Sequence, residues 1–416
     1  MHSHSRGNFR WLWTASTASA LGDGLATAAL PLLMLSVTRD PVLIASLQAA
    51  LGLPWLLFGL HAGLLADLWD RRRILWMADL LRLLVAGTIG GLAWADLTTW
   101  WTVLVLAFVY SIGTIAFRSA APALLPSVVA PEQIVEANSR LQFGTTGAAS
   151  FVGPGLGGLL FTLTTWVPFA TQALSFLVSV ICLRRLSPPT TQELPADRGP
   201  SSSAIRAGVT LVLRNRVLRV LAVGTTLLAA STGMLMAILA LFVVSTIGAP
   251  QVAYGLVFTV YSISSLAVAP LVARLHRELG GRRLLVLSGV GGTVGLSLMA
   301  AYPHVAGVAA GMLVLGAATM VYNVLAVSLR QRHSPDAMLG RVSSVYNLLG
   351  VGSAPIAAPI AGWIATSSVT AAVWTSAGLA AAATLALLVG LPSRREVDGQ
   401  LHDADRAARH PEDGAR

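Results

Sequence analysis

The chain has 416 residues, of which 55% are hydrophobic and only 11% are charged. A water-soluble domain carries about 25% charged residues. So few charged side chains cannot cover the surface of a soluble protein of this length, and we infer that lipid surrounds much of the chain. The composition therefore excludes a soluble enzyme or binding domain and predicts an integral membrane protein.

Apolar runs of the length of a membrane-spanning helix, about 20 residues, recur along the whole chain. There are twelve of them, six on each side of a polar segment rich in Pro, Ser and Arg. We therefore predict an all-α membrane protein with twelve transmembrane helices. The first six cover 11–37, 42–66, 74–95, 100–121, 138–163 and 166–186, and the second six cover 217–246, 251–273, 284–302, 304–328, 338–364 and 369–391.

The two halves share a sequence feature, which indicates an internal repeat. The dipeptide Arg72-Arg73 after the second helix recurs as Arg282-Arg283 after the eighth. Two related six-helix halves joined by a linker are a common transporter plan. The predicted domains are a first bundle at 1–186, a cytoplasmic linker at 187–216, a second bundle at 217–391 and a disordered cytoplasmic tail at 392–416.

The net charge is +10, and all 28 basic residues are Arg. A basic balance fits either nucleic acid or anionic lipid as a partner, and the positions of the arginines decide between them. If the N-terminus is inside, the outside loops hold only Arg39, whereas the inside connections hold groups such as Arg71–Arg73. This positive-inside pattern predicts that both termini are cytoplasmic in a multi-pass protein of the cell membrane. It also argues against a nucleic-acid partner.

The segment that begins at Gly63 reads GLLADLWDRRRIL. It resembles the loop signature of the major facilitator superfamily, G-x-L-a-D-r-x-G-R-[RK]-x-x-L, although two positions near its middle depart from that pattern. The resemblance implies that Asp67 forms a cytoplasmic gate with Arg71, Arg72 and, from the second half, Arg341. The structural alternative is that these arginines only anchor the loop on the inside.

The fifth predicted helix carries a glycine, then eight residues, then the sequence GPGLGG. It resembles the antiporter signature of the same superfamily, G-x8-G-P-x-x-G-G, at every fixed position. Small residues along a membrane helix let another helix approach closely. The resemblance implies export, whereas the alternative is a packing motif unrelated to direction. The fixed positions of the signature are Gly144, Gly153, Pro154, Gly157 and Gly158.

The start of the chain, FRWLWTASTASALGDGLATAALPLL, resembles the macrolide-efflux and enterobactin-exporter-like subgroup of this superfamily. The resemblance extends over essentially the whole chain. It implies two six-helix halves around one central cavity that opens alternately to each side of the membrane.

Charged residues inside predicted spans mark function by default, and we single out Asp23, Asp79, Arg82 and Arg118. Asp23 lies about 20 Å along the first helix from its charged start, at 1.5 Å per residue. We predict that Asp23 couples transport to protons; alternatively, it only hydrogen-bonds a glycine-flanked kink. Asp79 and Arg82 are three residues apart and can pair on one helix face, which we interpret as a structural pair. Arg118, at the inner end of the fourth helix, is interpreted as an interface anchor.

Polar and aromatic residues of the later helices are candidates for the cavity wall, because buried phenols and amides are costly without partners. For each candidate residue, a hydrogen bond between helices is an equally supported alternative to a place in the cavity wall. The candidates are Tyr261, Tyr322, Asn323, Tyr346 and Asn347. We find no metal-ligand spacing, phosphate-binding loop or pair of catalytic carboxylates. We therefore expect no metal, no bound cofactor and no enzymatic activity, with a proton gradient as the energy source.

The sequence favours a secondary transporter that exports a drug-like or secreted small molecule in exchange for protons, and that works as a monomer. One alternative is an importer or facilitator with the same fold. Another is a membrane scaffold that transports nothing. The residues do not identify the substrate.

Overall fold

The computed structural model describes residues 2–68, 70–130, 133–186, 202–335 and 338–392, and within them the side chains at 2–6, 59–68, 123 and 202–205 lie outside the description. Every regular element in these ranges is helical. The first half consists of α1 (His2–Val37), α2 (Pro41–Leu68), α3 (Arg71–Trp94), α4 (Trp100–Leu124), η1 (Leu125–Ser127), α5 (Ile134–Thr146), η3 (Gly147–Val152), α6 (Gly153–Leu163) and α7 (Val167–Arg185).

The second half repeats this arrangement after a short helix, α8 (Ser202–Arg214). Twelve helical spans of the described chain are long and apolar enough to cross a membrane, as the sequence predicted. The second half consists of α9 (Arg216–Ala240), η4 (Leu241–Thr246), α10 (Gln251–Val268), η5 (Ala269–Leu271), α11 (Val272–Leu279), α12 (Gly281–Ala301), α13 (Val305–Arg332), α14 (Leu339–Ala365) and α15 (Val369–Gly390).

Local sequence determines several helix ends. The Asp70 side chain accepts a hydrogen bond from the backbone N–H of Arg72 at 2.9 Å, which starts α3. Asn215 does the same for α9 by accepting from the backbone of Val217. Gly280 ends α11 with a φ of 81°, a left-handed conformation that glycine adopts without a steric penalty.

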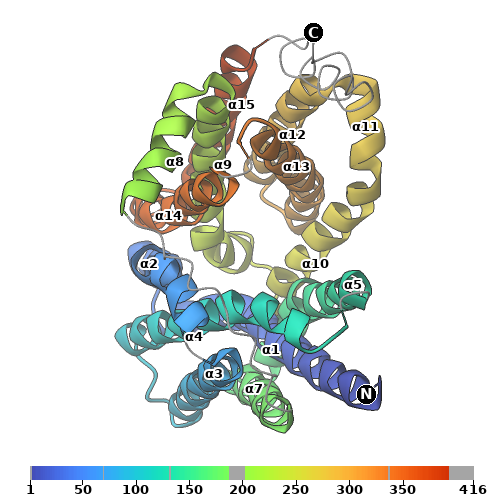
Figure 1. Ribbon diagram of the computed structural model, residues 1–416. Helices are drawn as coiled ribbons and strands as arrows, with labels where there is room; N and C mark the ends of the chain where they lie inside the picture. Colours follow the sequence, from blue (N-terminus) through green and yellow to red (C-terminus); the bar gives the residue numbers. More distant parts are fainter. Residues whose placement is uncertain (1, 69, 131–132, 187–201, 336–337, 393–416) are drawn as a thin grey trace.

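The halves lie side by side and meet mainly along two helix pairs: α2 with α14 (Figure 1), and α6 with α10. Small residues allow both contacts. An added Cβ at Gly52 of α2 would lie 3.0 Å from the Pro355 side chain of α14, and Gly158 of α6 faces the backbone of Gly255 in α10. In lipid, such close packing of helix backbones takes the place of the hydrophobic effect as the force between helices.

The segment predicted as a linker contains α8, which lies beside α9 and α14 (Figure 1). This helix was not predicted from the sequence. Gly208 lets it approach the start of α14, because an added Cβ there would lie 3.0 Å from the carbonyl oxygen of Arg341. Helix α8 is therefore docked on the second half.

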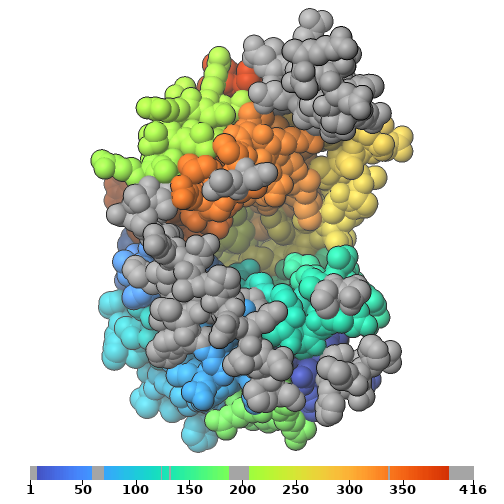
Figure 2. Space-filling model, in the orientation of Figure 1, coloured from blue at the N-terminus to red at the C-terminus, as the bar shows by residue number. Residues whose placement is uncertain are grey.

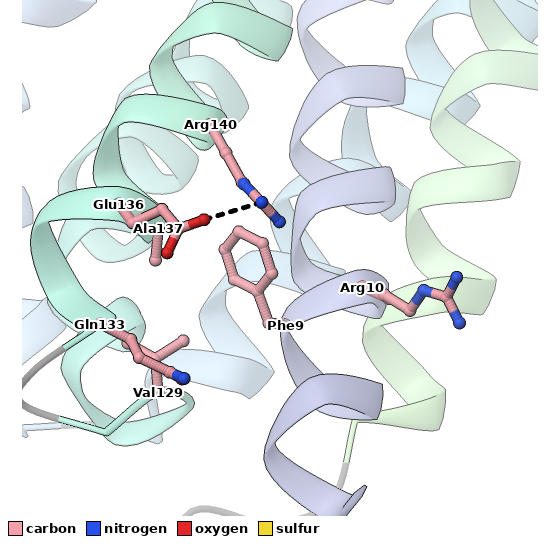
Figure 3. Close-up of a pocket in the computed structure, with 7 residues that line it drawn as sticks. All are labelled: Phe9, Arg10, Val129, Gln133, Glu136, Ala137 and Arg140. Atoms are coloured by element: carbon pink, nitrogen blue, oxygen red, sulfur yellow. Dashed lines mark ion pairs between the residues drawn. The ribbon is translucent and has the colours of Figure 1, made fainter. Parts of the chain in front are cut away.

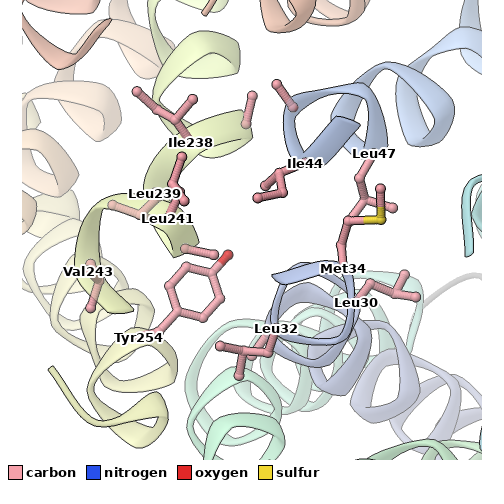
Figure 4. Packing of buried hydrophobic residues seen from close by; sticks show 14 of the residues in the cluster. Leu30, Leu32, Met34, Ile44, Leu47, Ile238, Leu239, Leu241, Val243 and Tyr254 are labelled. Atoms are coloured by element: carbon pink, nitrogen blue, oxygen red, sulfur yellow. The ribbon is translucent and has the colours of Figure 1, made fainter. Parts of the chain in front are cut away.

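Apolar side chains of both halves close one end of the bundle. Leu30, Met34 and Ile44 of the first half belong to the same buried cluster as Ile238 and Tyr254 of the second (Figure 4). We call this the arginine-poor end, because the described loops there carry Arg39 as their only arginine. The opposite end, where α8 begins, is the arginine-rich end.

The surface between the halves is hollowed, with the olive-coloured region of α9 and α10 at the bottom of the hollow (Figure 2). Since those helices form part of the apolar closure, the hollow runs from the arginine-rich end toward the arginine-poor end. The structure is therefore open at one end and closed at the other.

We predict that Gly255→Ala destabilises the closed end. An added Cβ would overlap the carbonyl oxygen of Pro154, which is backbone and cannot move without shifting a helix. Overpacking of this kind costs about 1–3 kcal/mol, so the thermal midpoint of the purified protein in detergent should fall. Gly87→Ala is the matched control, because nothing lies within 4 Å of its added Cβ. Equal midpoints for the two variants would contradict the close crossing.

Candidate functional site

The hollow between the halves contains two adjoining pockets of about 320 and 340 Å³. Both are lined by Gln48 and Met236, so they form one central cavity. Its charged residues come from the first half, whereas both halves contribute aromatic and uncharged polar side chains. The first-half side includes Asp23, Trp55, Tyr110, Ser111, Thr114 and Arg118, and the second-half side includes Thr225, Ser231, Thr232, Thr319, Tyr322 and Asn323.

A buried arginine organises the first-half wall. The Arg82 side chain is fully enclosed and forms ion pairs with Asp79 and with Asp23, the latter at 2.8 Å. Its guanidinium also lies over the rings of Phe117 and Phe176, each 4.7 Å from the ring centroid. One positive charge therefore stands between two carboxylates and two aromatic rings.

Two glycines make room for this arginine. An added Cβ at Gly113 of α4 would lie 2.8 Å from Cγ of Arg82, and one at Gly22 of α1 would lie 2.7 Å from the ring of Phe176. The sequence places Asp79 and Arg82 three residues apart on α3, so they share a helix face. Helices α1, α4 and α7 therefore all pack around the side chain that Arg82 extends from α3.

The two carboxylates have different surroundings. Asp79 is completely buried and accepts hydrogen bonds from Ser179 and, at 3.1 Å, from Ser19. The Asp23 side chain is 28% exposed, lines the cavity and accepts a hydrogen bond from the Tyr110 hydroxyl at 2.5 Å. Asp23 is thus the acid that a solute or proton in the cavity can reach, and Asp79 is the acid that holds Arg82 in place.

The sequence predictions paired Asp79 with Arg82 and left the cation near Asp23 undecided between Arg82 and Arg118, whereas the structure joins Asp23, Asp79 and Arg82. They also missed the hydroxyls that complete the cluster. One signal was present: Ser19 precedes Asp23 by four residues, which puts both on one face of α1. No comparable spacing in the sequence indicates Tyr110, because it contacts Asp23 from another helix.

Only two of the five predicted cavity residues line this cavity. Tyr322 and Asn323 do so, and the Tyr322 hydroxyl lies 2.9 Å from Oγ1 of Thr225. Tyr346 is instead buried in the second half, where its hydroxyl donates to the carbonyl of Leu218. The residues that are absent from both pocket linings are Tyr261, Tyr346 and Asn347.

The glycines of the antiporter signature divide between two neighbours. An added Cβ at Gly157 would lie 2.7 Å from the carbonyl oxygen of Leu25 in α1. The members that face α1 are Gly144, Gly153 and Gly157, whereas Gly158 faces α10 of the second half. The signature therefore serves both the packing of the first half and its contact with the second.

Pro154 adds hydrogen bonds to that contact. Proline has no backbone N–H, so the carbonyl of Ser150 loses its usual donor four residues later. Oγ of Ser262 in α10 donates to this carbonyl at 3.0 Å, and Oγ1 of Thr259 donates to the carbonyl of Phe151 at 3.1 Å. The π-helical stretch η3 is thereby joined to the second half by side chains.

The predicted gate is only partly visible. Gly63 and Asp67 lie outside the described side chains, so the role of Asp67 stays a prediction. Arg72 donates from Nε to the carbonyl of Leu183 at 2.9 Å and thus binds the end of α7. Arg341 is exposed at the start of α14, and its Nη1 lies 3.3 Å from Sδ of Met338.

A separate hollow of about 500 Å³ lies between α1 and α5 at the arginine-rich end (Figure 3). Its ion pair, Glu136 with Arg140 at 2.7 Å, has both side chains 65% exposed. The Trp13 side chain donates to the carbonyl of Arg140 at 3.0 Å and fixes α1 to α5. This hollow belongs to one half and carries solvated charges, so we place the transport site in the central cavity instead.

Twelve apolar helices in two halves, around a cavity with charged groups in its wall, define a membrane transporter. The comparison with protein families identifies one family. The family model described as "Transmembrane secretion effector" matches residues 3–411, and the chain belongs to this family of the major facilitator superfamily.

Relatives of known description agree with this family. The chain is 28% identical to the MFS-type transporter y4rN of Sinorhizobium fredii, over 90% of this chain and 94% of that protein. It is 28% identical to the multidrug efflux pump Tap of Mycolicibacterium fortuitum, over 93% and 96% of the two chains. It is 26% identical to macrolide efflux protein A of Streptococcus pyogenes over 42% of each chain.

Solved structures share the fold. A variant of the nucleoside transporter NupG superposes with a TM-score of 0.80 at 14% identity, covering 92% of this chain and all of that one. A bacterial homologue of the iron transporter ferroportin gives a TM-score of 0.73 at 17% identity, over 93% and 98% of the two chains. The two-half architecture predicted from the sequence is thereby confirmed.

We predict that Arg82→Gln strongly destabilises the protein, because it leaves two carboxylates without their shared cation. Breaking a buried ion pair costs about 3–5 kcal/mol. Arg140→Gln is the matched control, since its exposed pair is worth at most about 1 kcal/mol. Thermal unfolding in detergent should show a large loss for Arg82→Gln, and adding Asp79→Asn should restore part of it. If both arginine variants unfold at the same temperature, the buried cluster does not stabilise the fold.

Proposed function

We propose that this transporter exports a small, partly hydrophobic compound from the cell, driven by protons that enter through Asp23. The full-length similarity to a multidrug efflux pump and the partial similarity to a macrolide efflux protein support the export direction. The cavity supports the substrate class, because it offers aromatic and apolar side chains together with polar and charged groups. Its lining includes Tyr254, Phe258 and Met236 beside Gln48.

The observation that carries the proposal is the sharing of Arg82 between an enclosed carboxylate and an accessible one. When Asp23 takes up a proton, Arg82 keeps Asp79 as its partner, so the cluster remains paired. The bonds that weaken are those from Asp23 to Arg82 of α3 and to Tyr110 of α4. Proton uptake would therefore loosen α1 from its neighbours without leaving a buried charge alone.

The same helix contributes to the closed end of the molecule. Leu30 and Met34 of α1 belong to the apolar cluster that includes Ile238 of the second half. A change in how α1 is held at Asp23 can thus reach the contact between the halves, about 10 Å along the helix at 1.5 Å per residue. We propose that this link lets protonation favour one orientation of the cavity.

We propose that the arginine-rich end faces the cytoplasm, in keeping with the positive-inside rule. The structure then represents the inward-open state, in which Asp23 and the cavity are accessible from inside the cell. We further propose that one chain suffices for transport, since the cavity is formed by the two halves of one chain. We propose no nucleic-acid partner.

An importer with the same fold is the second candidate. A nucleoside transporter shares the architecture, but fold similarity at this identity carries no information on direction. A panel of chemically diverse antibiotics, tested with and without expression in a host that lacks its own efflux pumps, addresses the question. Export predicts raised resistance to at least one compound, and import predicts unchanged or lowered resistance to all.

We predict that Asp23→Asn abolishes gradient-driven transport of the compound that this panel identifies. The amide keeps the shape and some hydrogen bonds of Asp23 but cannot exchange a proton. In inverted vesicles the variant should no longer concentrate the compound under an imposed pH gradient, although it should still bind it. Glu136→Gln is the control, since it removes an acid outside the cavity. Uphill transport by Asp23→Asn with an unchanged dependence on the gradient would rule out this coupling site.

We predict that reporter fusions after Arg198 and in the C-terminal tail are cytoplasmic, because the linker and both ends of the chain lie on the arginine-rich side of the predicted topology. Paired fusions of alkaline phosphatase and green fluorescent protein report the side of each site. A fusion after Asp96, in the loop between α3 and α4, should give the opposite result and serves as the control. An external readout at either of the first two sites would overturn the topology.

A further inference from the structure

One cation in the cavity wall lies outside the cluster of Asp23, Arg82 and Asp79. The Arg118 side chain is exposed, and it lines the same pocket as Asp23. From the sequence it was interpreted as an anchor at the membrane interface, yet the structure places it on the wall between the two halves. A charged group that faces a cavity within a membrane protein is a candidate binding group.

Among the described residues, Arg118 lies near an aromatic ring and forms no ion pair with an acid. Its guanidinium carbon lies 5.9 Å from the centroid of the Trp55 ring, which orients the group while leaving its N–H donors available. Among the residues that line the two pockets the only acid is Asp23, and Asp23 is already bound by Arg82 and Tyr110.

The positions of the residues along their helices separate Arg118 from Asp23 and from Asp67. Arg118 follows Tyr110 by eight residues, which is about 12 Å along α4. Asp67 follows Trp55 by twelve residues, which is about 18 Å along α2. A group bound at Arg118 therefore lies about two helical turns from Tyr110, the residue through which α4 contacts Asp23.

We propose that Arg118 and Trp55 form a subsite for an anionic oxygen group, such as a carboxylate or phosphate, of an amphipathic substrate. The inference rests on the proposed export function, because it treats the central cavity as the substrate site. Guanidinium groups bind such oxygens through charge-assisted hydrogen bonds. The hydroxyl of Thr114 lies one helical turn before Arg118 on the same wall. The apolar body of the substrate would extend past Trp55 toward Tyr254 and Phe258, which line the same pocket.

Equilibrium binding of matched probes tests this subsite. Pyrenebutyrate carries an aromatic body and a carboxylate, and pyrenebutanol is its uncharged counterpart. In nanodiscs of phosphatidylcholine alone, Arg118→Gln should weaken pyrenebutyrate binding about tenfold, the value of a charge-assisted hydrogen bond, and leave pyrenebutanol unchanged. Arg118→Lys should retain part of the affinity, since it keeps the charge. Arg274 is an exposed arginine paired with Glu278. The control variant Arg274→Gln should bind both probes as the unmodified protein does.

The experiment separates a soluble substrate from a lipid headgroup as the source of the anion. If pyrenebutyrate binds Arg118→Gln as tightly as the unmodified protein, the subsite is overturned. The subsite is also overturned if Arg118 affects only the retention of phosphatidylglycerol in mixed nanodiscs, since the anion is then a lipid headgroup. Binding needs no gradient, so the result is independent of coupling through Asp23. If Asp23 proves not to couple transport to protons, the binding result still stands. If Arg118 proves not to bind the anion, coupling through Asp23 is unaffected.

Discussion

A single guanidinium shared by two carboxylates is the constraint on which the first half depends. The Arg82 side chain is fully enclosed, so its charge can remain in the bilayer only with partners. Asp79 supplies a permanent one, held by Ser19 and Ser179. Asp23 supplies another that the cavity can reach. In the mechanism that we propose, this separation lets Asp23 exchange a proton while Asp79 keeps Arg82 paired.

The contacts between the halves also follow from the absence of water in the bilayer. A membrane offers no hydrophobic effect to hold two bundles together, so association relies on close packing and hydrogen bonds. Glycines permit the crossing of α6 and α10, and the carbonyl freed by Pro154 accepts a hydrogen bond from the other half. Together these contacts join the two halves. In the alternating-access mechanism that we propose, they must break when the cavity changes sides.

The sequence predicted the twelve spans and the two halves because apolar length and arginine placement are properties of the chain itself. It also identified Asp23, Asp79 and Arg82, since charge inside an apolar run is visible without a structure. It could not join Asp23 to Arg82, because they lie on different helices and only packing determines their distance. Helix α8 was missed although Ile205, Val209, Val212 and Leu213 have the spacing of an apolar helix face. The polar residues around it favoured a linker instead.

The cavity candidates show the same limit. Tyr322 and Tyr346 are both phenols within apolar spans, and nothing in the residues around them separates the two. The structure places the first at the cavity and turns the second toward the backbone of α9. Which side of a helix faces the other half depends on the rotation of that helix in its bundle. The cavity lining is therefore a property of the tertiary fold.

In the mechanism that we propose, Asp23 and not Asp79 exchanges protons with the cavity. Infrared difference spectra on acidification of the protein in bilayers follow the formation of carboxylic acid from carboxylate. We expect that subtracting the Asp23→Asn spectrum from that of the unmodified protein leaves a carboxylic acid band, whereas subtracting the Asp79→Asn spectrum leaves none. A band that disappears with Asp79→Asn and persists with Asp23→Asn would contradict this mechanism.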